Sequence, residues 1–246
     1  MFEAVKYRKA RLSVLIDDLG KQPREDLITS SIFGKLPLLT PTAQLHALRF
    51  LTGADLTGEI EVMLWPRFGW PPTESDVLLK ITNAGVTSYW IIEAKWGANL
   101  HPNQIANEIA AVRTRTFWPR SHTGPRLIPL PLNGRRIAGY TLLGAEAKHD
   151  LQFDKARRDY DNVCFHRRTW PEIAQGLRNM FITDPGDPFL SAWAKMFADF
   201  LAETSKGQVL GHWRKLPMPE QEPYFFGGSR LDWKAHPVPT QSYIFN

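Results

Sequence analysis

The chain has only one cysteine and no long apolar run. These two features argue against disulfide-bonded, cysteine-metal and membrane-spanning classes of protein. Cys164 is the only cysteine among 246 residues, so the chain can form neither an intramolecular disulfide nor a cysteine metal cluster. This usage suits a reducing compartment, and we expect a cytoplasmic protein. No apolar run approaches the roughly 20 residues that span a bilayer, and the first residues lack the apolar core of a signal peptide. We therefore expect no membrane segment.

Acidic residues are missing from one long segment of the chain. Between Ile109 and Ala145 there is no Asp or Glu, and the arginines of this stretch are Arg113, Arg115, Arg120, Arg126, Arg135 and Arg136. The formal net charge of +5 is modest and by itself is typical of a solubilising surface. An arginine segment without acids is where a polyanion would be bound, and a solvated basic face is the alternative. We expect these arginines to bind nucleic acid.

Apolar residues, in contrast, are plentiful. Hydrophobic residues make up 43% of the chain and aromatic residues 12%, which is ample for one large domain with an appendage. We place the domain at residues 1–205. Residues 206–246 are rich in proline and aromatic residues and are expected to form an irregular tail, packed either on the domain or at an interface.

The spacing of apolar residues predicts an ordered series of helices and strands. Helices are expected at 11–19, 25–36, 41–51, 102–116, 169 to about 180, and 189–204. Strands are expected at 59–65, 75–81, 88–94, 137–143 and 162–166, with a hairpin turn at 83–85 and an exposed loop at 119–134. The predicted fold class is α/β, with a mixed central sheet of about five strands flanked by helices.

Charged residues stand at the ends of two neighbouring predicted strands. Asp76 borders one strand, and the apolar stretch at 89–92 runs directly into Glu93, Ala94 and Lys95. Two carboxylates about 4 Å apart repel by roughly 4 kcal/mol at an effective dielectric of about 20, so the pair needs a proton or a cation. Mg2+ accepts one or two carboxylates and completes its shell with water and phosphate oxygens. The pattern therefore indicates a divalent cation and a phosphodiester substrate.

This constellation resembles the signature of the PD-(D/E)XK nuclease superfamily, which has the restriction-endonuclease-like fold. The matching residues are Asp76, the Glu-Ala-Lys motif at 93–95, Glu25 at the start of an upstream helix, and Gln104 on the helix that follows. The resemblance covers roughly residues 24 to 180.

Two positions depart from the family pattern. Ser75 replaces the proline of the signature, which shapes the turn and does not bind metal. Glu108 stands four residues after Gln104, where the RecB-like subgroup has tyrosine, and this argues against that subgroup.

The resemblance implies an enzyme that hydrolyses phosphodiesters with Mg2+, for which Mn2+ would substitute. Asp76, Glu93 and the carbonyl of Ala94 would ligate the metal. Lys95, on the same side of its strand as Glu93, would orient and help to deprotonate the attacking water or stabilise charge on the phosphate. Glu25 would hold a metal-bound water or a second cation, and Gln104 completes the catalytic set.

The resemblance also suggests partners. It implies DNA as substrate in preference to RNA, and a role in bacterial restriction, repair or defence, as a homodimer or as a subunit of a complex. It does not distinguish an endonuclease from an exonuclease.

Other interpretations of the same residues remain open. The chain can be a nuclease-fold subunit that binds nucleic acid or acts as a scaffold with little activity of its own. Glu93 and Lys95 can be an exposed pair on a strand, Glu25 a favourable charge at a helix N-terminus, and Gln104 a surface residue. An enzyme acting on a nucleotide is a further alternative, but the chain lacks the Gly-x4-Gly-Lys-Ser/Thr phosphate loop.

Overall fold

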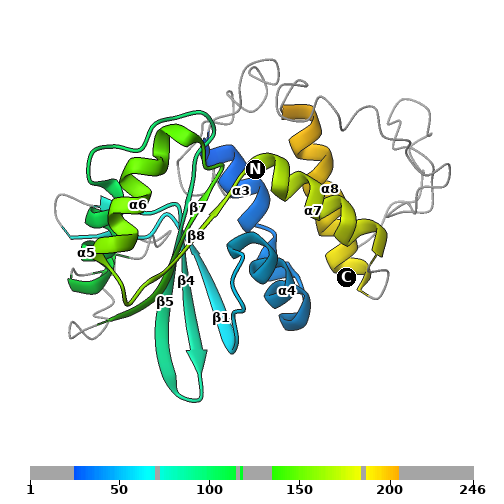
Figure 1. Cartoon of the computed structure of the whole chain (residues 1–246). Coiled ribbons are helices and arrows are strands. Elements are labelled where there is room, and N and C mark those ends of the chain that lie inside the picture. The colour runs from blue at the N-terminus through cyan, green and yellow to red at the C-terminus, as the bar shows by residue number, and fades with distance from the viewer. Residues whose placement is uncertain (1–24, 70–72, 115–116, 119–134, 184–186, 205–246) are drawn as a thin grey trace, which may run out of the picture.

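A five-stranded sheet with helices on both faces forms the centre of the protein (Figure 1). The computed structural model describes residues 25–69, 73–114, 117–118, 135–183 and 187–204. The strands lie in the order β1 (Glu59–Leu64), β4 (Val77–Asn83), β5 (Val86–Ala94), β7 (Arg136–Leu143) and β8 (Cys164–Arg168). The predicted α/β class with a mixed sheet of about five strands is confirmed.

The direction of the strands explains where the helices lie. β1, β4 and β5 are antiparallel neighbours, whereas β5, β7 and β8 run parallel to one another. Parallel neighbours need crossover connections, which here contain α5 (Gln104–Thr114) and then α6 (Asp150–Asp159). Successive crossovers of one handedness leave both helices on the same face of the sheet, as Figure 1 shows.

The turn between β4 and β5 fixes the register of the strands that carry the candidate site. Ala84 and Gly85 have φ values of 48° and 80°, and two positive φ values are typical of the tight hairpin turn that matches strand twist. The hairpin predicted from the sequence is confirmed. Its register pairs Asn83 with Val86 at the turn and Val77 with Ile92 at the far end. One residue beyond this last pair, Asp76 therefore lies opposite Glu93.

The other face of the sheet is covered by helices from both ends of the described chain. These are α3 (Glu25–Phe33), the short 3-10 helix η1 (Leu36–Leu38), α4 (Pro41–Thr52), α7 (Trp170–Thr183) and α8 (Pro188–Thr204).

The ends of two of these helices are set by residues visible in the sequence. Gly53, with φ of 71°, ends α4 in the left-handed conformation that glycine adopts without strain. Before α7, the Thr169 hydroxyl accepts from the Glu172 backbone N–H at 3.3 Å, and the Glu172 carboxylate accepts from the Thr169 N–H at 2.8 Å. This is the capping box that the sequence predicts.

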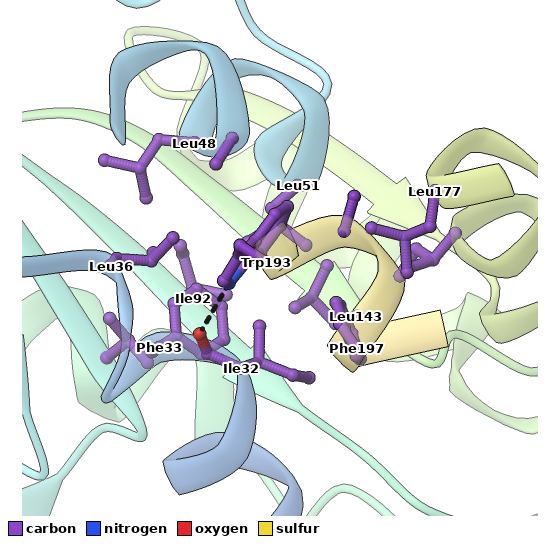
Figure 2. Close-up of a cluster of buried hydrophobic side chains, with 14 of the residues drawn as sticks. Ile32, Phe33, Leu36, Leu48, Leu51, Ile92, Leu143, Leu177, Trp193 and Phe197 are labelled. Carbon is purple, nitrogen blue, oxygen red and sulfur yellow. Dashed lines mark hydrogen bonds between the residues drawn. The ribbon is translucent and has the colours of Figure 1, made fainter. Parts of the chain in front are cut away.

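Two hydrophobic clusters form, one on each face, because side chains alternate along each strand. On β5, Trp90 and Ile92 point toward α3, α4, α7 and α8, while Tyr89 and Ile91 point toward α5 and α6. Trp193 of α8 lies deep in the first cluster, and its indole N–H donates to the Ile32 carbonyl at 3.2 Å (Figure 2). This alternation places Glu93 on the face of α5 and α6.

Two parts of the fold were not predicted. α6 buries only Phe153 and Ala156, and its Leu151 is 87% exposed, so its apolar stripe is too thin to indicate a helix. A second sheet, in the order β3-β2-β6, is made of strands of two residues each: Arg67–Phe68 (β2), Thr73–Glu74 (β3) and Phe117–Trp118 (β6). Strands of two residues are too short to show periodicity.

Several predictions fall on residues that the structure does not describe. They are the helix at 11–19, the loop at 119–134 and the tail at 206–246, so the domain boundary at 205 stays a prediction. Within the described ranges, none of the helices combines the length and the apolar composition needed to cross a bilayer.

Candidate functional site

Asp76 and Glu93 lie next to one another where β4 begins and β5 ends. Asp76 comes directly before Val77, whose partner in the sheet is Ile92. The Oδ2 atom of Asp76 accepts a hydrogen bond from the backbone N–H of Ala94 at 2.9 Å. The structure thus brings together the two carboxylates that the sequence assigns to a metal, and it places the Ala94 backbone beside them.

Lys95 joins this pair on the same side of the strand. Its Nζ lies 2.8 Å from Oε1 of Glu93, and the two side chains are only 7% and 5% exposed. The alternative of an exposed strand pair does not fit this burial. An ammonium and a carboxylate that are this close and this well shielded from solvent attract one another far more strongly than a pair on the surface does.

The backbone of Lys95 is fixed from two directions. Its N–H donates to the Leu143 carbonyl at 2.9 Å, and its carbonyl accepts from the indole N–H of Trp170 at 2.8 Å. The backbone of Gly144 lies close to the Lys95 carbonyl. A Cβ at position 144 would lie 2.0 Å from the carbonyl oxygen, so a side chain there would not fit. Gly144 also has a φ of 69°, so both the conformation and the space favour glycine.

Gln104 is the first residue of α5, and both polar atoms of its side-chain amide form hydrogen bonds. Its Nε2 donates to Oε1 of Glu93 at 2.7 Å and to Oε1 of Glu108 at 2.8 Å. Its Oε1 accepts from the backbone N–H of His101 at 3.1 Å. The alternative of a solvated surface residue does not fit these contacts.

The loop that leads to Gln104 is itself tied to the neighbouring helices. Lys148 donates to the Gly97 carbonyl at 2.7 Å, and His149 Nε2 lies 3.0 Å from the Ala98 carbonyl oxygen. The Nδ1 atom of His149 accepts from the Glu146 N–H at 3.2 Å, which assigns the ring proton to Nε2. These contacts join the loop before α5 to the short 3-10 helix η2 (Ala147–His149), which precedes α6.

Glu108 is a functional candidate that the sequence reasoning did not identify. Its side chain is 1% exposed, and its Oε2 accepts from the Tyr140 hydroxyl at 2.9 Å. Burial raises the pKa of Glu108 well above the ordinary value for glutamate, and the negative charges of Glu93 and Asp76 raise it further. The signal was present in the sequence, because Glu108 lies on the apolar side of α5 with Ile105.

Tyr140, from the centre of β7, was also missed. It is fully buried, and burial, followed by the charge of Glu108, raises the pKa of its hydroxyl well above the ordinary value. The phenol therefore keeps its proton at neutral pH and serves as a hydrogen-bond donor. Nothing in the sequence connects Tyr140 to Glu108, which lies 32 positions away on another element.

The donor set suits a hard cation. Asp76, Glu93 and the Ala94 carbonyl offer oxygen atoms only, as Mg2+ prefers. Within the described residues, there is no group of three or more His, Cys, Asp or Glu side chains that could hold a metal. Mg2+ does not need such a group, because it keeps several waters and binds through one or two carboxylates. The residues present fit this ion.

The position of Glu25 relative to the site stays a prediction. Glu25 is the first residue of α3, and its side chain is not among those described. α3 packs through Ile28 and Ile32 in the same cluster as Val77 and Ile92, on the sheet face opposite to Glu93. A role for Glu25 would require its side chain to reach around the end of the strands.

The arginine segment is only partly described, and its described members differ. Arg135 is buried, lies over the ring of Phe68 and donates to the Val112 carbonyl at 2.8 Å, which does not fit the predicted contact with nucleic acid. Arg113 is half-buried over the Tyr160 ring, whereas Arg136 is exposed. Arg115, Arg120 and Arg126 lie outside the described residues.

No family model, no curated protein and no solved structure matches this chain. The resemblance to the PD-(D/E)XK superfamily therefore rests on the motif residues and their arrangement, and membership stays a proposal.

The raised pKa of Glu108 leads to a prediction for stability. A carboxyl group whose pKa is higher in the folded than in the unfolded protein binds more protons when folded, so its contribution to stability is lost as pH rises through the folded value. We expect Glu108→Gln to remove this loss, so that the variant gains stability relative to the wild type as the pH rises above the ordinary pKa of a glutamate.

Urea unfolding of both proteins across this pH range measures the difference. Asp154→Asn, at an exposed carboxylate of α6, is the control and should leave the pH dependence of the wild type intact. A difference between Glu108→Gln and wild type that does not change with pH would show that the Glu108 carboxyl titrates alike in both states.

Proposed function

We propose that this protein is a metal-dependent nuclease that hydrolyses phosphodiester bonds, with DNA preferred over RNA, and that it belongs to the PD-(D/E)XK superfamily. The observation that carries the proposal is the convergence of Asp76, Glu93 and Lys95 where β4 begins and β5 ends. These are residue types of the superfamily signature in the same order, with Asp76 directly before β4, Glu93 near the end of β5 and Lys95 directly after it.

Stability alone does not account for this arrangement. Taking an ammonium and a carboxylate out of water costs several kcal/mol for each ion, and apolar residues of similar size are often at least as stable. Here two more carboxyl groups, Asp76 and Glu108, lie near the Glu93 and Lys95 pair. Carboxyl groups gathered in this way are unfavourable for folding unless a proton or a cation offsets their charge, so their presence supports a role in binding a cation and in catalysis.

The chain's own residues have separate roles in this reaction. Asp76, Glu93 and the Ala94 carbonyl would hold Mg2+, which supplies Lewis acidity and lowers the pKa of a bound water. Lys95 is charged in its ion pair with Glu93, so it donates hydrogen bonds to the water or to a phosphate oxygen. During hydrolysis the water oxygen bonds to phosphorus as the bond between phosphorus and the leaving oxygen breaks. The water gives one proton to the solvent, and the leaving oxygen takes up a proton from the solvent.

A binding or scaffolding subunit is the second candidate function. The observation in its favour is that the Lys95 ammonium pairs with Oε1 of Glu93 and Gln104 donates to the same atom, so that both offset the charge of Glu93 without a cation. Under either function the exposed Arg136 is a candidate phosphate contact. A homodimer, or a restriction, repair or defence complex, is the assembly we propose for the nuclease.

Incubation of the purified protein with supercoiled plasmid, linear DNA and RNA tests the proposal. We expect cleavage of DNA with Mg2+ or Mn2+, no cleavage with EDTA, and none by Asp76→Asn. Glu61→Gln is the matched control, because Glu61 is a carboxylate on β1 of the same sheet that is 61% exposed and pairs with Lys80.

The outcomes separate the two functions. Cleavage that survives Asp76→Asn would exclude this site as the catalytic one. Salt-sensitive DNA binding without metal-dependent cleavage would favour the binding subunit.

A further inference from the structure

The amide of Gln104 can take two orientations, and its neighbours allow only one. In the observed orientation Nε2 lies between Oε1 of Glu93 and Oε1 of Glu108, and the amide oxygen faces the His101 N–H. Rotation by half a turn would place the amide oxygen against two carboxyl groups and the amide N–H2 against another N–H. The hydrogen bonds that Gln104 makes with Glu93 and His101 would be replaced by repulsive contacts.

Glu108 is held in turn by Tyr140. The Tyr140 hydroxyl donates to Oε2 of Glu108, while Oε1 of the same group accepts from Gln104. Tyr140 lies in the middle of β7 opposite Ile91 of β5, between two paired strands, so its ring is anchored by the sheet itself. A chain of hydrogen bonds therefore runs from the sheet through Tyr140, Glu108 and Gln104 to Glu93.

The series of hydrogen bonds that ends at Gln104 determines how the Glu93 carboxylate is held. Gln104 donates to Oε1 of Glu93 at 2.7 Å, and the Lys95 ammonium forms an ion pair with the same atom at 2.8 Å. Among the residues that the structure describes, none donates a hydrogen bond to the other oxygen, Oε2. Gln104, whose own amide is held in one orientation, fixes the rotation of the carboxylate, and Oε2 is the oxygen that remains for a ligand.

We propose that Glu108 and Tyr140 are positioning residues of this site, which orient the Gln104 amide so that Glu93 presents Oε2 to the cation. The inference rests on the proposed function, because it assumes that Glu93 ligates a metal. It assigns a role to the residue at which the chain departs from the RecB-like pattern. Glu108 and Tyr140 act through Gln104 and touch neither the metal nor the substrate.

The state of Glu108 agrees with this role. Its raised pKa keeps the group neutral over a wider pH range than an ordinary glutamate, which avoids a third negative charge beside Asp76 and Glu93. A neutral carboxyl still accepts from Gln104. Glutamine at this position is also neutral, can accept from Gln104 and can donate to the Tyr140 oxygen, so Glu108→Gln should keep the chain of hydrogen bonds connected.

The test compares Glu108→Gln, Glu108→Met and Tyr140→Phe by Mg2+ affinity, measured by calorimetry without DNA, and by the rate of plasmid cleavage. Groups that orient metal ligands typically change affinity or activity about 10- to 100-fold when they are lost. We expect a loss of this size for Glu108→Met, a smaller loss for Tyr140→Phe, and near wild-type values for Glu108→Gln. Tyr89→Phe, a buried tyrosine on the same face, is the control and should match the wild type.

A double variant separates positioning from general destabilisation. If Glu108 acts through Gln104, then Glu108→Met should cost little further Mg2+ affinity once Gln104→Met is present, because both changes break one connected unit. Fully additive losses would overturn the proposal. If Glu108→Met does not fold, Tyr140→Phe and its combination with Gln104→Met give the same comparison.

The results also distinguish this inference from the proposed function. If the wild type binds Mg2+ and cleaves DNA while folded Glu108→Met and Tyr140→Phe equal it, the positioning role alone is wrong. If the wild type neither binds Mg2+ nor cleaves nucleic acid, the proposed function fails and the positioning role fails with it.

Discussion

Replacement of Lys95 by methionine should lower the rate of metal-dependent DNA cleavage by at least about 100-fold, the lower end of what a positioned proton donor or charge contributes. Methionine keeps the length of the aliphatic part but removes the ammonium. The charge that develops on the phosphate then has no positive side chain at this point of the site. Cleavage rates at saturating Mg2+ measure the effect.

Metal binding should respond differently from catalysis in this variant. The ammonium competes with a cation for Glu93, because its Nζ lies 2.8 Å from Oε1. Removal of Lys95 should therefore leave Mg2+ affinity equal to or higher than that of the wild type. A variant that loses cleavage only because it no longer binds Mg2+ would contradict the role given to Lys95.

Lys80→Met provides the matched control for this experiment. Lys80 lies on β4 of the same sheet and also pairs with a carboxylate, Glu61, at 3.1 Å, but these side chains are 35% and 61% exposed. Exposed pairs of this kind contribute little, so the control should cleave DNA and unfold like the wild type. Urea unfolding of Lys95→Met should be recorded too, since the change leaves Glu93 buried without its ion-pair partner.

Replacement of Trp193 by alanine should lower the free energy of unfolding by about 3–5 kcal/mol, the range for large aromatic residues in cores. Trp193 is 2% exposed and lies among residues of α3, α4 and the sheet (Figure 2). Its loss removes apolar contacts and leaves a cavity, and the Ile32 carbonyl loses its indole donor. The free energy of unfolding of a domain is typically about 5–15 kcal/mol in total, so this single substitution would remove much of the stability.

Met196→Ala on the same helix is the control for Trp193. Met196 is 47% exposed, so its truncation should change the free energy of unfolding by less than about 1 kcal/mol. Trp193→Phe keeps most of the volume and should show an intermediate loss. Equal effects of Trp193→Ala and Met196→Ala would mean that α8 is not an integral part of the core.

Local patterns in the sequence were sufficient for much of the fold. The hairpin at Ala84 and Gly85, the capping box at Thr169 and the end of α4 at Gly53 depend on residues within a few positions of one another. Their stereochemistry is the same wherever the segment lies. α6 could not be found in this way, because its apolar side is thin and the rest of the fold stabilises it.

The residues of the candidate site also fall into two groups: those that local sequence patterns predict and those that depend on tertiary packing. Asp76, Glu93 and Lys95 could be brought together from sequence because a hairpin register and strand alternation are local rules, and the structure has both. The partners of Gln104 depend on where α5 packs. The burial of Arg135 over the ring of Phe68 could not be predicted either, since a charge count does not show which arginines point inward.

The sequence by itself determined the α/β class, the strands that carry the acidic residues and the side of the strand on which each charge lies. Only the tertiary structure decided that Tyr140 reaches Glu108, that Glu108 holds Gln104, and that Gln104 and Lys95 share one oxygen of Glu93. The physical reason is that turns and alternation follow from the backbone of neighbouring residues. Hydrogen bonds between side chains of different elements depend on how those elements pack, which no short stretch of sequence encodes.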